Sequence, residues 1–170
     1  MADAAPPTPT FDDLSILAAR VGEALVARGQ RVAVAESSTG GLISAALLTV
    51  PGGSAFYLGG SVIYTGRARG MLFERGDLPE GTRGATEDYA KRLSRGAAKK
   101  LRSEWAVAET GATGPAGNPY GDPPGHSWVA VSDPEGNTTT RVVATGDDDR
   151  AGNMFRFASA ALELLDEALR

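Results

Sequence analysis

The sequence predicts an α/β fold: a single layered domain with a mixed, mainly parallel sheet flanked by helices. Short apolar runs bounded by turn residues, which are typical of buried strands, alternate with longer segments whose apolar residues recur at helical spacing. One pair of strand-like segments is separated by a short polar turn, which indicates an antiparallel hairpin. The length of 170 residues suits one domain. We therefore expect a flexible N-terminal arm over residues 1–10 and one domain over 11–170.

The first half of the chain predicts two helices, two strands and a final helical turn. Thr10 and Asp13 have the spacing of a capping box, with Asp in place of the usual Glu or Gln. Gly29 suits the end of that helix, whose apolar residues recur at helical spacing as Leu14, Leu17, Val21 and Leu25. The segments that follow are interpreted as a buried strand at 32–35, a helix of small residues at 40–50, a strand at 61–64 and a short helix at 67–73.

The second half predicts a helix, three strands and a closing helix. Thr86 is a suitable N-cap for a helix over 87–102, which carries one apolar stripe. A strand at 105–109 leads into a loop rich in glycine and proline at 110–125. The remaining elements are strands at 127–131 and 139–145, joined by the hairpin turn at 133–137, and a helix at 150–169.

The composition excludes several classes of site. Apolar residues make up 42% of the chain and charged residues 22%, as in ordinary globular proteins. The absence of cysteine excludes disulfides, thiolate metal sites and cysteine nucleophiles, and the single histidine, His126, excludes a multi-histidine metal site. A net charge of −4 provides no basic face for nucleic acid. No secretory signal and no membrane-spanning run is recognised, so we expect a cytoplasmic protein with no membrane partner.

Polar residues follow directly on the first predicted strand, in the run Glu36-Ser37-Ser38-Thr39-Gly40-Gly41. Strand ends are where α/β sheets commonly present ligands, and hydroxyls at this point would lie beside the positive end of a helix. That setting suits an anion or a serine nucleophile. The alternative is an ordinary helix N-cap whose glycines allow close packing.

Two later segments occupy similar positions after strands. Arg67 and Arg69 follow Tyr64, and two arginines there suit a phosphate, although a solvated surface turn is the alternative. Residues 109–117 hold clustered glycines, which let backbone amides approach a ligand closely. This segment is neither a P-loop nor a dinucleotide-binding fingerprint. A plain long loop is the alternative, but loops of this length in compact domains are commonly functional.

The order and spacing of these segments resemble the CinA C-terminal domain family. The resemblance is carried by residues 35–41, 59–64 and 110–115, with support from Gly84-Ala85-Thr86 and from Gly146-Asp147 with Arg150. It covers nearly the whole chain after the N-terminal arm. Long CinA proteins also have a molybdopterin-binding-like N-terminal domain, for which 170 residues are too few, so we expect a stand-alone member.

The resemblance implies nicotinamide-nucleotide amidase activity, in which nicotinamide mononucleotide is converted to nicotinate mononucleotide and ammonia during pyridine-nucleotide recycling. It places the nucleophile at Ser37, because Ser38 stands where many members have cysteine, and it assigns the family's tyrosine to Tyr64. The substrate-binding residues that it implies are Glu36, Thr39, Gly40, Gly41, Thr110, Gly111, Thr113, Gly114 and Arg150. Family members are commonly dimers or larger, so a homo-oligomer is also implied.

One position departs from the family pattern. A lysine typically lies five residues after the tyrosine and is thought to activate the serine, but this chain has Arg69 there. A lysine with a lowered pKa can take the serine proton, whereas an arginine stays protonated. Only 3 of the 17 basic residues are lysine, so the exchange also fits a general preference for arginine. Arg69 could still hold a phosphate or an oxyanion, and Glu36 or His126 would then act as base.

Three hypotheses follow. In the first, Ser37 attacks the carboxamide carbon, backbone amides at residues 39–41 stabilise the oxyanion, ammonia leaves, and water resolves the acyl-enzyme without a metal or organic cofactor. In the second, the scaffold binds a nucleotide or another metabolite without turnover, because the base is lost. In the third, the chain is a structural or regulatory partner protein, although its negative net charge argues against direct contact with nucleic acid.

Overall fold

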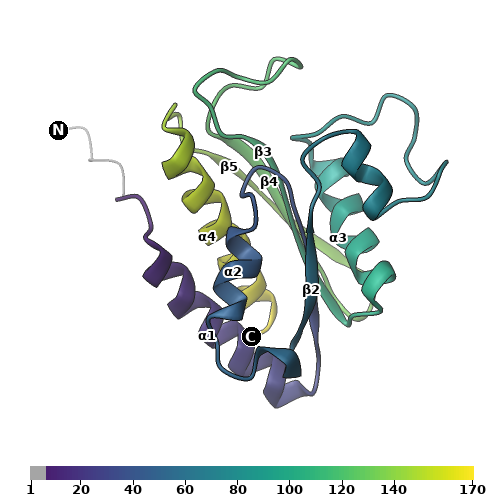
Figure 1. Cartoon of the computed structure of the whole chain (residues 1–170), viewed down its shortest axis with the longest axis vertical. Coiled ribbons are helices and arrows are strands. Elements are labelled where there is room, and N and C mark those ends of the chain that lie inside the picture. The colour runs from purple at the N-terminus through teal and green to yellow at the C-terminus, as the bar shows by residue number, and fades with distance from the viewer. Residues whose placement is uncertain (1–6) are drawn as a thin grey trace.

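A five-stranded sheet separates two helical layers in the computed structural model, which describes residues 7–170 (Figure 1). The first six residues of the expected N-terminal arm lie outside the described residues. One face of the sheet is covered by α1 (Phe11–Arg28), α2 (Leu42–Leu48) and α4 (Arg150–Ala168), and the other face by α3 (Glu87–Leu101). The strands are β1 (Val32–Glu36), β2 (Tyr57–Val62), β3 (Trp105–Ala112), β4 (His126–Ser132) and β5 (Thr138–Ala144). Two 3₁₀ turns, η1 (Gly53–Ala55) and η2 (Arg67–Met71), flank β2.

The sheet is mixed, with the strand order β2-β1-β3-β4-β5. β1 is parallel to both of its neighbours, β2 and β3, while β3, β4 and β5 form two antiparallel pairs. The antiparallel share, two pairs of four, is therefore larger than the expected mainly parallel sheet would have. Because β1, β2 and β3 run in one direction, their carboxyl ends meet at a single edge, where open α/β sheets present ligands.

Local sequence signals account for the helix ends. The Thr10 hydroxyl accepts a hydrogen bond from the Asp13 amide, and the Asp13 carboxylate accepts one from the Thr10 amide at 2.7 Å, which completes the expected capping box of α1. α1 ends at Gly29, whose φ of 60° is a left-handed conformation that glycine adopts without strain. Thr86 caps α3 in the same way, by accepting from the Tyr89 amide.

Two strands differ from the sequence expectation by more than one residue at an end. β2 begins at Tyr57 rather than at residue 61, because this edge strand pairs with β1 through its backbone and contains Gly59 and Gly60 instead of an apolar run. β3 continues to Ala112 rather than ending at residue 109, because β4 pairs with it along the whole extension. Residues 110–112 are thus the end of a strand and not the start of a loop.

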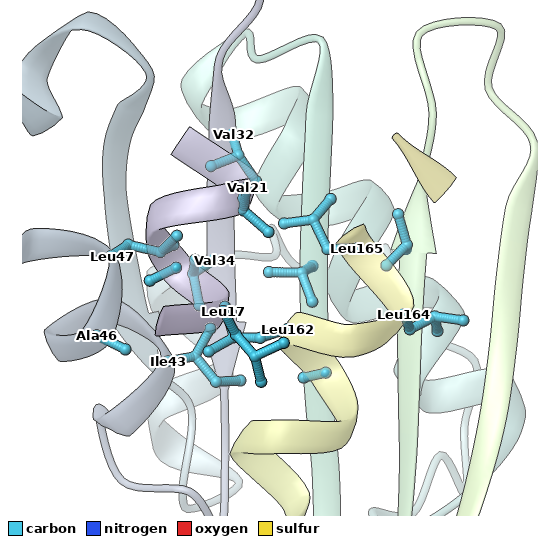
Figure 2. Close-up of a cluster of buried hydrophobic side chains, with 14 of the residues drawn as sticks. Leu17, Val21, Val32, Val34, Ile43, Ala46, Leu47, Leu162, Leu164 and Leu165 are labelled. Carbon is cyan, nitrogen blue, oxygen red and sulfur yellow. The ribbon is translucent and has the colours of Figure 1, made fainter. Parts of the chain in front are cut away.

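Period-two alternation divides the core between the two faces of the sheet. Val32 and Val34 point toward α1, α2 and α4, where they join the larger cluster that includes Leu17, Leu47 and Leu162 (Figure 2). Ala33 and Ala35 point toward α3, where their small size allows the helix to approach closely. The same alternation predicts that Glu36 lies on the first face and Ser37 on the second. Within residues 7–170, no helix is both long and apolar enough to cross a membrane.

Candidate active site

A cavity of about 310 Å³ lies at the carboxyl edge of the three parallel strands, on the face covered by α3. Ser37 follows β1 and contributes to its wall, and the rest of the wall comes from segments that are distant in the sequence. These are residues 63–66 with Arg69, 84–85 with Tyr89, 110–111, and 118–120. Ser37, Tyr64 and Arg69, which occupy the positions of the family's serine, tyrosine and lysine, therefore line one cavity.

The two neighbouring serines point to opposite faces of the sheet. Ser38 is buried, and its hydroxyl lies 2.5 Å from Oε1 of Glu109 on β3. Ser37 is half-buried, lines the cavity, and has no hydrogen-bond partner for its Oγ among residues 7–170. Only the backbone of Ser37 is held, because its amide donates to Glu109 Oε2 at 3.2 Å. Ser37 is thus the serine that can reach a ligand in the cavity.

Glu36 holds the start of α2 from the opposite face of the sheet. Its side chain is fully buried and its two oxygens accept five hydrogen bonds, from the amides of Gly41, Ile43 and Ser44 and from the hydroxyls of Thr39 and Ser44. These donors sit at the positive end of a helix, which suits a carboxylate. Glu36 is not part of the cavity wall.

The amides that we expected to stabilise an oxyanion are already occupied. The Thr39 amide donates to Glu109 at 3.0 Å, the Gly41 amide donates to Glu36 at 3.0 Å, and the Gly40 amide donates to the Ser37 carbonyl at 3.3 Å. That expectation is therefore not supported. The two carboxyls take up the donors that a free helix N-terminus would have offered to a ligand.

Glu109 is a second buried carboxyl, joined to the Ser37–Thr39 turn from β3. Besides the contacts with Ser38 and with the Ser37 and Thr39 amides, it lies 2.9 Å from the Ser127 hydroxyl on β4. Burial raises the pKa of Glu109, and these hydrogen bonds oppose the rise. Glu109 is fully buried and does not contribute to the cavity wall.

Arg69 is a fixed cation in the cavity wall. Its guanidinium lies over the Tyr89 ring, 4.7 Å from the ring centroid, and donates to the Thr82 carbonyl at 2.8 Å. Burial raises the pKa of Tyr89, although the nearby Arg69 opposes the rise. Since an arginine remains protonated in proteins, Arg69 supplies positive charge to the cavity and cannot serve as a base.

Arg150 lies at the rim, where it links Tyr64 to the segment after β3. It is the first residue of α4, and its guanidinium donates to the Tyr64 hydroxyl at 3.1 Å and to the Gly114 carbonyl at 2.6 Å. Tyr64 itself is 61% exposed, so this contact is what fixes the position of its phenol beside the cavity.

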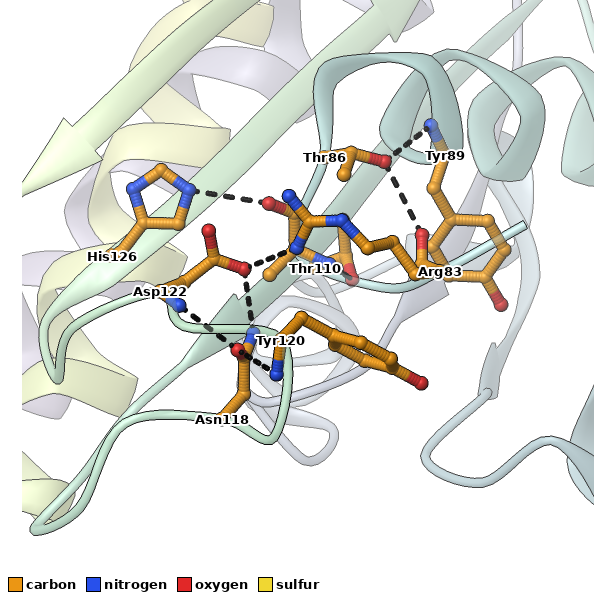
Figure 3. A network of polar contacts seen from close by, with 9 residues as sticks. Arg83, Thr86, Tyr89, Thr110, Asn118, Tyr120, Asp122 and His126 are labelled. Carbon is orange, nitrogen blue, oxygen red and sulfur yellow. Dashed lines mark hydrogen bonds and ion pairs between the residues drawn. The ribbon is translucent and has the colours of Figure 1, made fainter. Parts of the chain in front are cut away.

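A polar network holds the outer wall of the cavity (Figure 3). The Asp122 carboxylate accepts hydrogen bonds from Arg83 at 2.6 Å and from Asn118 at 2.7 Å, which ties the 118–122 loop to the segment before α3. Burial would raise the pKa of Asp122, but Asn118 and Arg83 outweigh it and hold the pKa below its ordinary value. The Arg83 guanidinium also lies 5.5 Å from the centroid of the Tyr120 ring, and so keeps this aromatic side chain at the wall.

The structure separates the expected substrate-binding residues into two groups. Of these residues, Thr110 and Gly111 line the cavity. The others lie behind the wall or at its rim, namely Glu36, Thr39, Gly40, Gly41, Thr113, Gly114 and Arg150. His126, the alternative base, is also absent from the wall, and its Nε2 lies 3.2 Å from the Ala85 carbonyl.

Sequence reasoning did not single out Glu109, Tyr89 or the Asn118–Tyr120 segment. Glu109 is the last residue of the strand expected at 105–109, and that expectation assigns no role to its side chain. The sequence does contain a signal for Glu109, namely the three consecutive hydroxyl residues at 37–39. Buried hydroxyls need hydrogen-bond acceptors, and a carboxyl on a neighbouring strand can provide them. Tyr89 was hidden because it falls in an amphipathic helix, where aromatic residues commonly serve the core.

Comparisons with known proteins agree with the motifs. The sequence model of the CinA C-terminal domain matches residues 14–169. The chain belongs to this family. The CinA-like protein of Synechocystis sp. is 33% identical over 153 residues, which are 89% of this chain and 36% of that protein. The CinA-like protein of Anaeromyxobacter dehalogenans is 37% identical over 147 residues, 86% of this chain and 36% of that protein. This CinA domain thus spans little more than a third of these relatives.

Solved structures share the whole fold of this CinA domain. The competence/damage inducible protein CihA of Agrobacterium tumefaciens is 34% identical and superposes with a TM-score of 0.83, covering 96% of this chain and 98% of that chain. The competence damage-inducible protein A of Klebsiella pneumoniae is 32% identical with a TM-score of 0.84, covering 92% of this chain and 96% of that chain. The family and fold class expected from the sequence are confirmed.

Proposed function

We propose that this CinA domain is a serine-dependent amidohydrolase that converts nicotinamide mononucleotide to nicotinate mononucleotide and ammonia. The observation that carries the proposal is the orientation of the two serines. Ser38 is engaged with Glu109 on one side of the sheet, whereas Ser37 lines a cavity that also contains Arg69 and Tyr64. A cavity with an unengaged serine hydroxyl, a fixed cation and aromatic walls suits an anionic, ring-containing amide substrate.

The cavity wall holds candidate partners for the phosphate, the aromatic ring and the carboxamide of such a substrate. Its volume of about 310 Å³ falls in the range of small-molecule sites. We assign the phosphate to Arg69, which is the one cation among the described residues that line the wall. We assign the aromatic ring to the neighbourhood of Tyr89 and Tyr120, and the carboxamide carbon to Ser37.

The chemistry requires a group that takes the Ser37 proton and returns it to the leaving ammonia. Arg69 stays protonated, Glu36 is committed to five donors behind the wall, and His126 does not line the cavity. We therefore assign a proton relay to Tyr64, which lines the cavity and whose phenol is oriented by Arg150: its oxygen accepts the Ser37 proton as its own proton passes to the carboxamide nitrogen, so the phenol stays neutral. Ser37 Oγ bonds to the carboxamide carbon, ammonia departs, and water then cleaves the acyl-serine ester to release the carboxylate.

The test is ammonia and nicotinate mononucleotide formation by the purified protein from nicotinamide mononucleotide. Ser37→Ala should abolish turnover, and Tyr64→Phe should reduce kcat by about 10²- to 10⁴-fold, the usual contribution of a proton-transfer group. Ser54→Ala, at an exposed serine remote from the cavity wall, is the matched control and should retain full activity. Turnover that persists in Ser37→Ala would refute the proposed nucleophile.

A nucleotide-binding protein without turnover is the second candidate, and one observation favours it. The residue at the family's lysine position is an arginine whose guanidinium is immobilised by Tyr89 and Thr82. Such an arginine can still bind an anion, but it cannot act as a general base. Calorimetry with nicotinamide mononucleotide separates the two functions: binding that Arg69→Ala weakens, with no ammonia released by the wild-type protein, would favour the binder.

A further inference from the structure

Two fully buried carboxyls, Glu36 and Glu109, lie on the face of the sheet opposite the cavity. They come from neighbouring parallel strands and are joined by one side chain. The Thr39 hydroxyl lies 2.8 Å from Glu36 Oε2 and 3.2 Å from Glu109 Oε2. Neither carboxyl forms an ion pair within residues 7–170, so no cation there compensates for two negative charges in this interior.

The hydrogen atoms around these carboxyls can be counted. The Ser44 hydroxyl donates its own hydrogen to Glu36 Oε1 at 2.6 Å. The hydroxyls of Ser38, Thr39 and Ser127 supply one further hydrogen each. They make five close oxygen–oxygen contacts, because Thr39 lies near both carboxyls and Ser127 lies near both Glu109 and the Thr110 carbonyl, 3.1 Å away. Two contacts therefore have no hydroxyl hydrogen of their own, and one proton on a carboxyl would fill one of them.

The donors distinguish the two carboxyls. Both oxygens of Glu36 face backbone amides, which can only donate, so neither oxygen can carry a proton without opposing a donor. Only Oε2 of Glu109 faces amides, those of Ser37 and Thr39. Its Oε1 faces the hydroxyls of Ser38 and Ser127, which can accept as well as donate. The extra proton therefore fits on Oε1 of Glu109.

We propose that Glu109 is a neutral carboxylic acid that positions the nucleophile: its Oε2 accepts from the Ser37 and Thr39 amides, and its Oε1–H donates to the Ser127 hydroxyl. The role toward Ser37 rests on the proposed amidohydrolase function, whereas the protonation of Glu109 does not. Ser38 then donates to Oε1 of Glu109, Ser127 donates to the Thr110 carbonyl and Thr39 donates to Glu36, so that each of the three hydroxyl hydrogens has one acceptor.

Neutrality of this acid suits the chemistry assigned to Ser37. Attack by Ser37 creates a negative charge on the substrate oxygen, and an ionised carboxylate directly beneath the same turn would oppose it. Burial raises the pKa of Glu109, which agrees with the neutral form. The groups in contact with Glu109 from the 37–39 turn and from β4 are uncharged amides and hydroxyls, and Glu36 on β1, reached through Thr39, is the titratable side chain linked to it.

The sign of the pH dependence follows from the raised pKa. The folded protein retains the Glu109 proton at pH values where the unfolded chain, with a glutamate pKa near 4.3, has lost it. The stability that this proton contributes is fully present below the pKa of Glu109 in the unfolded chain. It is lost as the pH rises toward the pKa of Glu109 in the folded protein. In this window, the unfolding equilibrium constant should rise by about tenfold for each pH unit.

The decisive experiment is urea unfolding of the full chain between pH 5 and pH 8, for the wild type and for Glu109→Gln. Glutamine reproduces the neutral acid, because its oxygen can accept from the two amides and its NH₂ can donate to the hydroxyls of Ser38 and Ser127. We expect the pH-dependent loss of stability in the wild type to be absent from Glu109→Gln. Glu135→Gln, at an exposed hairpin residue, should behave as the wild type does. Equal pH dependence in Glu109→Gln and the wild type would overturn the proposal.

A second measurement needs only the wild-type protein. Infrared spectroscopy detects the carbonyl stretch of a protonated carboxylic acid, and at pH 7 exposed carboxyls are ionised. We expect such a band at pH 7 that disappears at alkaline pH, and its absence at pH 7 would also overturn the proposal. This readout stands even if Glu109→Gln fails to fold.

The positioning role has its own readout in the amidase assay. The wild type should lose kcat as the pH rises through the Glu109 titration, and Glu109→Gln should lack that alkaline decline. A merely structural role would lower kcat in the variant and leave the shape of the pH profile unchanged. Absence of turnover in the wild type would instead count against the proposed function, while the unfolding and infrared results would still decide the protonation of Glu109.

Discussion

Replacing Glu36 by glutamine tests whether a carboxylate holds the β1–α2 junction. Glutamine keeps the size of the side chain but turns one acceptor oxygen into an NH₂ group. If the amide oxygen takes the place of Oε2, the donors Thr39, Gly41 and Ile43 are retained, and the NH₂ group faces the Ser44 amide. At least one backbone N–H of α2 is then left opposite a donor at a buried position.

The size of the loss follows from these contacts. An unsatisfied buried donor costs about 1–3 kcal/mol, and removing the negative charge from a helix N-terminus costs about 0.3–1 kcal/mol more. The retained hydrogen bonds also become weaker, because they lose their charged acceptor. We expect Glu36→Gln to lower the free energy of unfolding by about 2–4 kcal/mol, which is a large part of the stability of a small domain.

The assay is urea denaturation at pH 7 followed by far-UV circular dichroism. Glu109→Gln is the matched comparison, because it makes the same chemical change at an equally buried carboxyl on the adjacent strand. Since only one oxygen of Glu109 faces amides, its replacement should cost much less than that of Glu36. If both variants lose the same free energy, or if Glu36→Gln loses less than about 1 kcal/mol, the argument from backbone donors is refuted.

Three further predictions concern the cavity and its walls. Arg69→Lys should raise KM for nicotinamide mononucleotide about tenfold, equivalent to about 1.4 kcal/mol, because lysine cannot form the planar contact with Tyr89. A higher kcat in this variant would instead show that a base had been restored. Gly111→Ala should cost about 1–3 kcal/mol of stability, since its Cβ would lie 2.6 Å from Ser127 Cβ, whereas Gly70→Ala, in open space, should cost little. Asp122→Asn should raise KM by releasing the 118–122 loop. The pKa of Asp122 is lowered from 3.8 in the folded protein. The difference in unfolding free energy between the wild type and Asp122→Asn should therefore be present at neutral pH and vanish as the pH falls through the folded pKa.

The sequence predicted the helices well because their signals are local. The Thr10–Asp13 capping box and Gly29 define both ends of α1 within the helix itself. β2 was found only in part, because an edge strand that contains Gly59 and Gly60 has no apolar run. Its start is determined by pairing with β1, which is information that lies elsewhere in the chain.

The candidate site likewise contains some residues that local sequence identifies and others that depend on contacts between distant segments. Ser37, Tyr64 and Arg69 were selected by the resemblance to the family, and the parallel strands bring those positions to one edge. Glu109 required the register of β3 against β4, which places Ser127 within 2.9 Å of it. The Asn118–Tyr120 wall required the Arg83–Asp122 contact across 39 residues, for which the sequence carries no local signal.

The alternation at the end of β1 has a consequence for mutagenesis. Consecutive residues of a strand point to opposite faces, so Glu36 lies beneath α2 and Ser37 lies toward the cavity on the α3 side. Substitutions at 36 should therefore change the free energy of unfolding more than KM, and Ser37→Ala should abolish turnover with little change in stability. If Ser37→Ala were as destabilising as Glu36→Gln, Ser37 would have to be a packed part of the turn, and its assignment as a free hydroxyl in the cavity would be wrong.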